Sequence, residues 1–381
     1  MAARRVDGVA RELLAPLLAN GLDGWRAIGW DAEQGISLTV ERAGVALLVE
    51  LAPRDDGLPA FARTARFNVQ ARRVASREPL DEEARRFVAA FAALVGLRES
   101  RLPPLDGKTD ESADDRVAVR EILVERALIP ERAGAYYFNP YAGCLIGCAY
   151  CYVAERAALS RALDGAPPAR WGRFVDVKVN APEVLRDETA RLPPGPVRMS
   201  PILTDPYQPI ERRYRITRRS LEVLLDAGFA PVVLTRAARL VEDLALLRRF
   251  PRAAVGFSIP TDDDEVRRAF EPGADPVEDR FAALAECARA GVRTFAVVQP
   301  ILPMNVARLV DKIAPFVSAV RIDRMHEMRK ALPLYQAAGR LDAARDSFFV
   351  ETESALREAF SRRGIPVDES DDLGALVSSS R

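Results

Sequence analysis

Short apolar segments alternate with helical segments from about residue 136 onward, and this alternation constrains the fold more than any other feature of the chain. The strand candidates are Ala135–Asn139, Val197–Leu203, Pro231–Thr235, Ala254–Ile259, Thr294–Gln299 and Ala319–Ile322. The helix candidates are Ala154–Leu163, Arg218–Ala227, Val241–Arg249, Pro276–Ala290 and Val306–Ala314. Near-continuously apolar strands that alternate with helices are typical of a parallel sheet covered by helices. The sequence therefore predicts an α/β fold with a six-stranded parallel sheet, either open or a partial barrel.

The first 99 residues follow a different pattern. A helical pattern at 6–18 precedes three strand-like runs at 25–30, 36–41 and 45–51, and Arg42-Ala43-Gly44 suits a hairpin turn between the last two runs. A further strand over 67–74 and a helix over 81–95 complete this part. These elements predict a small α+β accessory domain at residues 1–99.

The composition of the remaining segments sets the other expected boundaries. Residues 100–116 are polar and rich in proline and acidic residues, which is typical of a linker. We expect the parallel sheet within residues 117–330. Residues 331–381 are expected to form a C-terminal helix and a tail that frays after Pro366. Periodicity does not decide whether residues 174–179 form a strand or an extended insertion.

Charge and hydropathy narrow the class of protein. Lys+Arg and Asp+Glu each number 55, so the formal net charge is zero, which argues against a large electrostatic surface for nucleic acid. The chain has no run of about 18 apolar residues, so no transmembrane helix is expected. The N-terminal helix has an amphipathic pattern rather than that of a signal peptide. The expected compartment is the cytoplasm.

Three of the four cysteines lie within eight residues and form the motif C-x3-C-x2-C at Cys144, Cys148 and Cys151. Thiolates are soft ligands for iron–sulfur clusters, and a [4Fe–4S] cube usually takes four of them. Three ligands leave one iron open for a substrate or cofactor. A structural zinc site is the competing interpretation, but it uses four ligands. The fourth cysteine, Cys287, lies in an expected helix whose apolar face would bury it.

The segment AGCLIGCAYCYV, which follows a strand candidate, resembles the cluster loop of the radical S-adenosylmethionine (SAM) superfamily. Further phrases in residues 136–324 resemble its spore photoproduct lyase-related branch: TDPYQPIERRYRITRRSLEVL, VVLTRA, VGFSI, AFEPGADPVEDR and VVQPILPMN. The resemblance implies a partial (β/α)6 radical SAM barrel with the small N-terminal α+β domain outside it. It also implies a [4Fe–4S] cluster, SAM and an external electron donor of the flavodoxin or ferredoxin type. In the superfamily, SAM on the open iron is cleaved reductively to a 5′-deoxyadenosyl radical that abstracts a hydrogen atom.

The resemblance assigns cofactor-binding roles to residues beyond the cysteines. Thr204 and Asp205 end the second barrel strand, where the superfamily binds the amino group of SAM. Arg236 stands where the lyases have a lysine for the SAM carboxylate, and an arginine fork suits a carboxylate. The other cofactor-binding candidates are Tyr150, Tyr152, Ser258, Glu271, Arg280 and Gln299. Several of these residues follow expected strands, and ligands bind at the carboxyl ends of parallel strands.

Simpler interpretations stand beside these roles. The two tyrosines are alternatively core-packing residues, and Ser258 is alternatively a turn cap. Glu271 and Arg280 are alternatively a surface salt bridge. The accessory domain either recognises a peptide or partner through an exposed sheet edge or serves as a cover on the barrel.

The sequence departs from the lyases at one catalytic position. The lyases use an additional cysteine as a hydrogen-atom donor, but the corresponding stretch, residues 199–205, contains none. Thymine-dimer repair by the lyase mechanism is therefore not expected. The candidate catalytic groups are Tyr150, Tyr152, Tyr207 and His326. The leading hypothesis is a radical SAM enzyme that acts on an unidentified small-molecule or peptide substrate. The alternatives are a lyase-like enzyme that acts on DNA or another nucleic acid, and a non-catalytic iron–sulfur or zinc protein.

Overall fold

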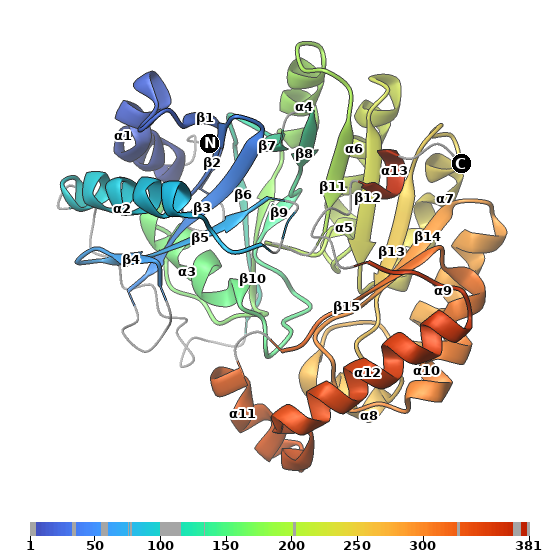
Figure 1. The fold of residues 1–381 in the computed structure, drawn as a ribbon. Coiled ribbons are helices and arrows are strands. Elements are labelled where there is room, and N and C mark those ends of the chain that lie inside the picture. The colour runs from blue at the N-terminus through green and yellow to red at the C-terminus, as the bar shows by residue number, and fades with distance from the viewer. Residues whose placement is uncertain are drawn as a thin grey trace.

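The computed structural model describes residues 5–32, 36–54, 60–74, 76, 78–99, 116–132, 134–200, 203–325, 328–368 and 375–378. Three sheets organise these residues (Figure 1). The first is antiparallel and lies in the N-terminal part, the second has three strands, and the third has eight. Most of the expected linker, residues 100–115, lies outside the described residues.

The N-terminal part contains two helices and a five-stranded sheet of order β1-β2-β3-β5-β4. Its elements are α1 (Arg5–Asn20), β1 (Arg26–Asp31), β2 (Ile36–Arg42), β3 (Val45–Pro53), β4 (Ala62–Arg63), β5 (Phe67–Arg73) and α2 (Glu82–Gly96). The hairpin between β2 and β3 is confirmed, with Ala43 and Gly44 at φ of 49° and 80°. Asp81 begins α2, because its side chain accepts a hydrogen bond from the Ala84 amide.

One face of this five-stranded sheet forms its own core against α1 and α2. Trp25, Leu38, Val49 and Phe87 are among the buried residues of that core. The opposite face carries polar side chains and packs toward the rest of the chain. There, the Thr39 hydroxyl of β2 donates to the Pro130 carbonyl at 3.3 Å.

The eight-stranded sheet has the order β16-β15-β14-β13-β12-β11-β8-β7. Its strands are β7 (Ile129–Arg132), β8 (Ala135–Tyr137), β11 (Pro196–Met199), β12 (Ala230–Thr235), β13 (Ala254–Ser258), β14 (Arg293–Val298), β15 (Ala319–Ile322) and β16 (Val367–Asp368). The six strands from β8 to β15 are parallel and lie in chain order. The sheet is open, with β7 and β16 at its edges, so the expected partial (β/α)6 barrel is confirmed.

Helices cover the outer face of this sheet (Figure 1). The connections contain α5 (Glu211–Tyr214), α6 (Ile216–Asp226), the 3-10 helix η2 (Ala238–Asp243), α7 (Leu244–Leu247), α8 (Asp264–Phe270), α9 (Val277–Arg289), α10 (Val306–Ile313) and the 3-10 helix η3 (Ala314–Phe316). The chain continues through α11 (Met328–Ala337), the 3-10 helix η4 (Leu341–Ala344) and α12 (Asp346–Arg362). The expected boundary at residue 330 falls within α11.

The three-stranded sheet has the order β6-β10-β9 and resolves the ambiguity at residues 174–179. Its elements and their flanking helices are β6 (Ala118–Ile122), β9 (Tyr141–Ala142), α3 (Val153–Leu163), β10 (Phe174–Lys178) and α4 (Ala181–Thr189). All five residues of β10 are buried, which removes the alternation that identifies a half-exposed strand. Asp176 in β10 accepts from both Arg120 and Arg161, so this buried carboxylate is paired.

The tail after Pro366 differs from the expectation that it frays. Residues 367–368 form β16 beside β15, and Ala375–Ser378 form the short helix α13. Leu376 and Val377 pack with Val232 and Phe295 on the inner face of the sheet, the face opposite the covering helices. Burial of these two apolar side chains therefore fixes the helix at the sheet, as Figure 1 shows beside β12.

Candidate active site

The cysteine loop, residues 143–152, runs from β9 to α3. Cys144 and Cys148 are 8% and 7% exposed, and Cys151 is half-buried. The three thiols interact electrostatically with one another, and burial is the largest cause that raises the pKa of each to about 12. The free thiols are therefore protonated at neutral pH, and a metal that binds them must displace their protons.

The segment that follows β11 holds this loop in place. The Gly143 carbonyl accepts hydrogen bonds from Thr204 Oγ1 at 2.7 Å and Gln208 Nε2 at 3.1 Å. Gln208 Oε1 accepts from the Leu145 amide at 2.8 Å. Gln208 is fully buried and was not among the predicted site residues, although it lies in the TDPYQP phrase. Its sequence neighbours do not indicate that its side-chain amide forms a hydrogen bond with a loop residue 63 positions earlier in the chain.

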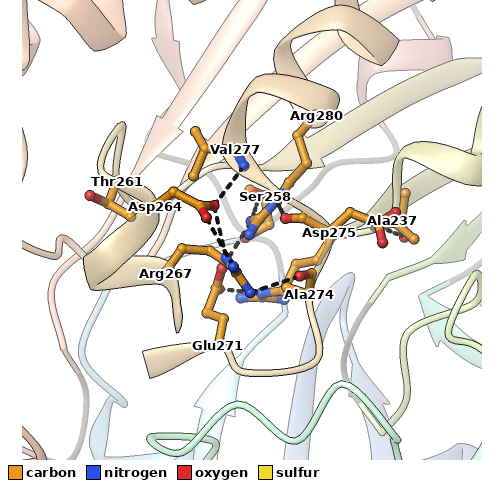
Figure 2. A network of polar contacts seen from close by, with 12 residues as sticks. Ala237, Ser258, Thr261, Asp264, Arg267, Glu271, Ala274, Asp275, Val277 and Arg280 are labelled. Carbon is orange, nitrogen blue, oxygen red and sulfur yellow. Dashed lines mark hydrogen bonds and ion pairs between the residues drawn. The ribbon is translucent and has the colours of Figure 1, made fainter. Parts of the chain in front are cut away.

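The segment after α8 supports the opposite side of the loop. The Gly273 amide donates to the Ile146 carbonyl at 3.0 Å, and a Cβ added to Gly273 would lie 2.7 Å from that carbonyl oxygen. Arg267 donates to the Ala274 carbonyl at 3.2 Å, and Figure 2 shows its guanidinium reaching across the turn. The phrase EPGADP is therefore a platform for the cysteine loop.

Gly147 is expected to be irreplaceable in the cysteine loop. Its φ is +60°, and an added Cβ would lie 2.9 Å from the Gly172 Cα. Gly147→Ala adds a left-handed penalty of about 1–2 kcal/mol to a backbone clash. We expect a large loss of iron after anaerobic reconstitution, measured by metal analysis. The control is Gly291→Ala, because Gly291 has a φ of +79° but no atom within 4 Å of the added Cβ. Equal iron retention in both variants would contradict the enclosed loop.

Glu271 is the centre of a buried ion network beside the cysteine loop. Its Oε1 accepts from Arg236 Nε at 2.6 Å and from the Tyr150 hydroxyl at 2.6 Å, and its Oε2 accepts from Arg280 Nη1 at 2.9 Å. Glu271 and Arg280 are both 0% exposed. Burial opposes the charge, but Arg280 and Arg236 outweigh it and lower the pKa of Glu271 to about 2. Glu271 and Arg280 therefore do not form a surface salt bridge, because both belong to a buried network. This network joins Tyr150, the residue before Cys151, to the ends of β12 and β13.

Arg236 follows β12 and is anchored at several atoms. Its Nη2 donates to the Tyr150 hydroxyl at 3.2 Å and to the Gln299 carbonyl at 3.4 Å. Its amide donates to Asp205 Oδ2 at 2.8 Å. Its Nη1 atom makes none of these contacts. The hydrogen bonds of Nε and Nη2 therefore fix the position of the guanidinium, and Nη1 takes no part in them.

Asp205 lies at the same edge of the sheet and is 1% exposed. Its Oδ1 accepts from the Thr235 hydroxyl and from the Tyr207 amide. Burial raises the pKa of Asp205, whereas these donors and the Arg236 amide lower it, with a net increase. The carboxylate thus joins the turn after β11 to the end of β12.

Ser258 and Arg280 each present an unpaired polar atom. Arg280 Nη1 donates to the Ser258 carbonyl at 2.9 Å, and Figure 2 shows this side chain extending from α9 toward the end of β13. The Ser258 hydroxyl and Arg280 Nη2 are buried without a hydrogen-bond partner. Buried polar groups are normally paired, so an unpaired donor at a strand end is suited to a ligand. A turn-capping role for the Ser258 side chain is not observed.

Strand register aligns further polar side chains with Ser258. Ser258 pairs with Val297 of β14, and Val297 pairs with Arg321 of β15. The neighbours of Arg321, Val320 and Ile322, pack against the outer helices, so Arg321 belongs to the inner face. Arg321 Nη2 lies 3.8 Å from Asp323 Oδ2, which also lies 3.4 Å from Gln299 Nε2. Sequence reasoning did not select Arg321, although its place between two apolar strand residues is the signal that marks it.

The predicted catalytic tyrosines occupy different environments. Tyr150 joins the Glu271 network, as described above. Tyr152 is 41% exposed, lies under Arg156 and interacts electrostatically with Glu50 and Arg72 of the N-terminal sheet. Tyr207 is buried on the outer, helix-covered side, where its hydroxyl donates to Asp243 at 3.0 Å. The structure therefore does not bring Tyr207 to the cysteines. His326 lies outside the described residues.

The three cysteines of the loop are the candidate ligands of a metal centre. Among the described side chains, no group of three or more His, Cys, Asp or Glu residues converges as the ligands of one ion do. A [4Fe–4S] cube places each thiolate on a different iron, so its ligands stand apart, and the chemistry of three thiols on one loop suits it. Cys287 is fully buried in the core between the sheet and its outer helices, so it is not a fourth ligand.

None of the helices in the described part of the chain has the length and apolar character needed to cross a bilayer.

Several known proteins are similar to about half of this chain. A protein of Methanocaldococcus jannaschii is 25% identical over 207 residues, which cover 53% of this chain and 76% of the relative. A Mycobacterium tuberculosis protein is 31% identical over 221 residues, 55% of this chain and 61% of the relative. A radical SAM Nalpha-GlyT isomerase of Pseudomonas phage M6 is 27% identical over 217 residues, 56% of this chain and 42% of the relative.

Two solved structures have a limited similarity to this chain. A spore photoproduct lyase variant with bound AdoMet and dinucleoside spore photoproduct has a TM-score of 0.43 at 18% identity, over 61% of this chain and 75% of the lyase. Streptococcus suis SuiB bound to the precursor peptide SuiA has a TM-score of 0.41 at 10% identity, over 76% of this chain and 55% of SuiB.

The family comparison covers the cysteine loop and most of the parallel sheet. The model of the radical SAM superfamily matches residues 138–311. This range includes the three cysteines, Asp205, Arg236, Ser258 and the Glu271 network. Residues 138–311 therefore match the radical SAM superfamily, whose members are enzymes of SAM-cleaving radical chemistry.

Proposed function

We propose that the protein holds a [4Fe–4S] cluster on Cys144, Cys148 and Cys151 and abstracts a hydrogen atom from an organic small molecule or peptide. The observation that carries this proposal is the loop with three thiols, two of them buried and one half-buried, beside the carboxyl ends of β12 and β13. When bound, the cluster and SAM supply reductive cleavage to methionine and a 5′-deoxyadenosyl radical. The chain's own residues bind, orient and enclose these groups.

Arg236 is suited to bind the SAM carboxylate. Three contacts to Glu271, Tyr150 and Gln299 hold its guanidinium, while its Nη1 atom makes none of them. A guanidinium nitrogen fixed in this way forms a charge-assisted hydrogen bond to a carboxylate with little loss of side-chain entropy. Glu271 acts as the positioning residue, because it sets the orientation of Arg236 and balances its charge.

The contacts of Thr204 and Asp205 are mainly structural, but both residues border the site at which we propose that SAM binds. Thr204 fixes the Gly143 carbonyl, and Asp205 fixes the Arg236 amide. We assign the amino group of SAM to the edge of the site near Asp205, whose carboxylate has accepting capacity beyond its three contacts. Gln299 and Arg321 would then face the substrate from β14 and β15.

The experiment is anaerobic reconstitution of the full chain with iron and sulfide, followed by reduction in the presence of SAM. We expect about four irons per chain, from the ligand chemistry of the loop, and formation of 5′-deoxyadenosine. Candidate small molecules and peptides are then compared with DNA for their ability to increase 5′-deoxyadenosine formation. A reconstituted cluster that never cleaves SAM contradicts the proposed function, and stimulation by DNA alone supports the lyase-like alternative.

Ser258→Ala is expected to weaken SAM binding without loss of stability. Removing an unpaired buried hydroxyl costs the fold little, but a hydrogen bond to SAM is worth about 1 kcal/mol, or about fivefold in Kd. Calorimetric titration of SAM into the reconstituted protein measures the change. Ser220→Ala is the matched control, because Ser220 also has a buried, unpaired hydroxyl but belongs to α6, a helix outside the sheet, rather than to a strand end. An equal Kd in both variants would remove Ser258 from the binding site.

A further inference from the structure

The inner face of the eight-stranded sheet carries small side chains near the amino ends of its central strands, opposite the candidate site. Ala230, Ala254 and Ala319 are the first residues of β12, β13 and β15, and all three are buried. Gly256 lies on the same face as Ala254, because side chains alternate along a strand. Bulky branched side chains usually fill the interior of a β/α barrel. These four positions supply none, so another part of the chain has to fill the space beside them.

The C-terminal helix α13 supplies this apolar bulk. Leu376 and Val377 are 8% and 3% exposed. They belong to one buried cluster with the three alanines and with Val232, Leu234, Phe295 and Val297. The helix lies beside β12 (Figure 1) and has four residues, too few to be stable on its own. The position of α13 therefore depends on these apolar contacts rather than on helix propensity.

Strand register shows how near this cluster is to the candidate site. Gly256 pairs with Phe295, and Phe295 pairs with Ala319, so the three residues form one layer across the inner face. The Phe295 ring covers Gly256, since a Cβ added to Gly256 would lie 2.3 Å from a ring carbon. Ser258 is two residues further along β13, or about 7 Å at the usual rise of a strand. This layer, in which two of the three members are small, therefore lies between Ala254 and the site.

We propose that α13 is a plug that closes the amino end of the barrel and keeps water and dissolved oxygen away from the site. The outer face of the sheet is covered by its own helices, whereas this end of the inner face is covered by Leu376 and Val377. Enclosure of a site excludes water and prevents side reactions of reactive intermediates. The position of the plug is a property of the fold, but its protection of a cluster rests on the proposed function.

The first experiment uses the protein without a cluster and tests whether α13 covers this apolar face. The variant is Leu376→Asp with Val377→Asp, because a carboxylate is costly to bury without a partner. Its control is Leu332→Asp with Val350→Asp, which makes the same two exchanges at side chains that are 44% and 50% exposed. Both double variants change the net charge equally. The probe is anilinonaphthalenesulfonate, a dye that fluoresces when it binds exposed apolar surface.

We expect severalfold stronger dye fluorescence for the α13 variant than for the wild type and the control, with unchanged far-ultraviolet circular dichroism. The circular dichroism should remain because α13 contributes four residues and lies outside the main core. Equal fluorescence of the α13 variant and the wild type, or an equal increase in the control, overturns the plug.

The second experiment measures protection of the site. The three proteins are reconstituted anaerobically, their iron contents are compared, and air-saturated buffer is then added while the visible absorbance of the cluster is followed. We expect the α13 variant to take up the same iron and to lose its absorbance severalfold faster than the wild type and the control. Equal rates of loss contradict the protective role. Failure of the proposed function is distinct, because the wild type would then take up no cluster, while the dye would still report where α13 lies.

A milder pair of substitutions keeps the proposal testable if the aspartates disturb the whole fold. Leu376→Ala with Val377→Ala removes apolar contact area without adding charge, and Leu332→Ala with Val350→Ala is its control. The α13 pair should increase dye binding and the rate of absorbance loss in the same direction, by smaller factors. If the α13 pair and its control give the same dye fluorescence and the same rate, α13 is not a plug.

Discussion

Cys148→Ala is expected to abolish 5′-deoxyadenosine formation, whereas Cys287→Ala should retain it. Both cysteines are buried, at 7% and 0% exposure, so the two substitutions remove a similar side chain from a similar environment. Only Cys148 lies on the loop beside Arg236 and Glu271. Loss of one of three thiolates removes the attachment of one iron, and the remaining two do not hold the cube.

The measurement combines iron content, the absorbance of the reconstituted cluster and chromatography of 5′-deoxyadenosine. Cys287→Ala creates a small cavity in the core at α9 and should lower stability modestly, by about 1 kcal/mol. Equal iron content and equal activity in the two variants would show that the C-x3-C-x2-C motif does not bind the cluster. Loss of iron in both variants would indicate that Cys287 is a fourth ligand, against its position in the outer core.

Glu271→Gln is expected to cause the largest loss of stability of any isosteric substitution in the site. The carboxylate is 0% exposed and balances Arg236 and Arg280. Glutamine keeps the shape but removes the charge, and its NH2 group faces arginine donors. Removing one partner of a buried pair costs about 3–5 kcal/mol, because the remaining charge is uncompensated.

Denaturant unfolding measures this change in the free energy of unfolding. The matched control is Glu278→Gln, because Glu278 is also paired with two cations, Arg308 and Lys312, both at 2.9 Å, but its side chain is 55% exposed. Exposed pairs contribute less than about 1 kcal/mol, so the control should remain near the wild type. A similar, small effect of both substitutions would mean that the Glu271 network does not stabilise the platform of the cysteine loop.

The SAM-dependent reaction offers an independent measure of the same network. Glu271 positions Arg236 through Oε1 and the Tyr150 hydroxyl through the same oxygen. In a Glu271→Gln variant that remains folded, Arg236 should lose its fixed orientation, and the Kd for SAM should rise while the iron content is retained. A purely structural role would lower stability and leave this Kd unchanged.

The local sequence determined the element types because they depend on short-range periodicity. Apolar runs separated by helical repeats predicted the six parallel strands, and the resemblance to the radical SAM superfamily assigned Asp205, Arg236 and Ser258, which follow or end those strands. The cysteine spacing identified the loop, since all three ligands lie within eight residues. These features require no knowledge of which segments meet in space.

Tertiary structure decided which partners the polar residues have. Tyr207 and Asp205 are two residues apart, yet one faces the outer helices and the other the site, because the turn after β11 reverses direction between them. Glu271 lies 121 residues from Tyr150, and a local pattern does not reveal such a pairing. The tail shows the same limit, since Leu376 and Val377 are ordered only by the apolar inner face of a distant sheet.

The three cysteines could thus be identified from the sequence alone, but the polar residues that surround them in the structure could not. Spacing specifies a ligand set when its members lie on one loop. The charge network and the unpaired Ser258 hydroxyl come from segments that are far apart in the sequence. Only the packing of the sheet against its helices brings those segments together, because long-range burial rather than local preference fixes their positions.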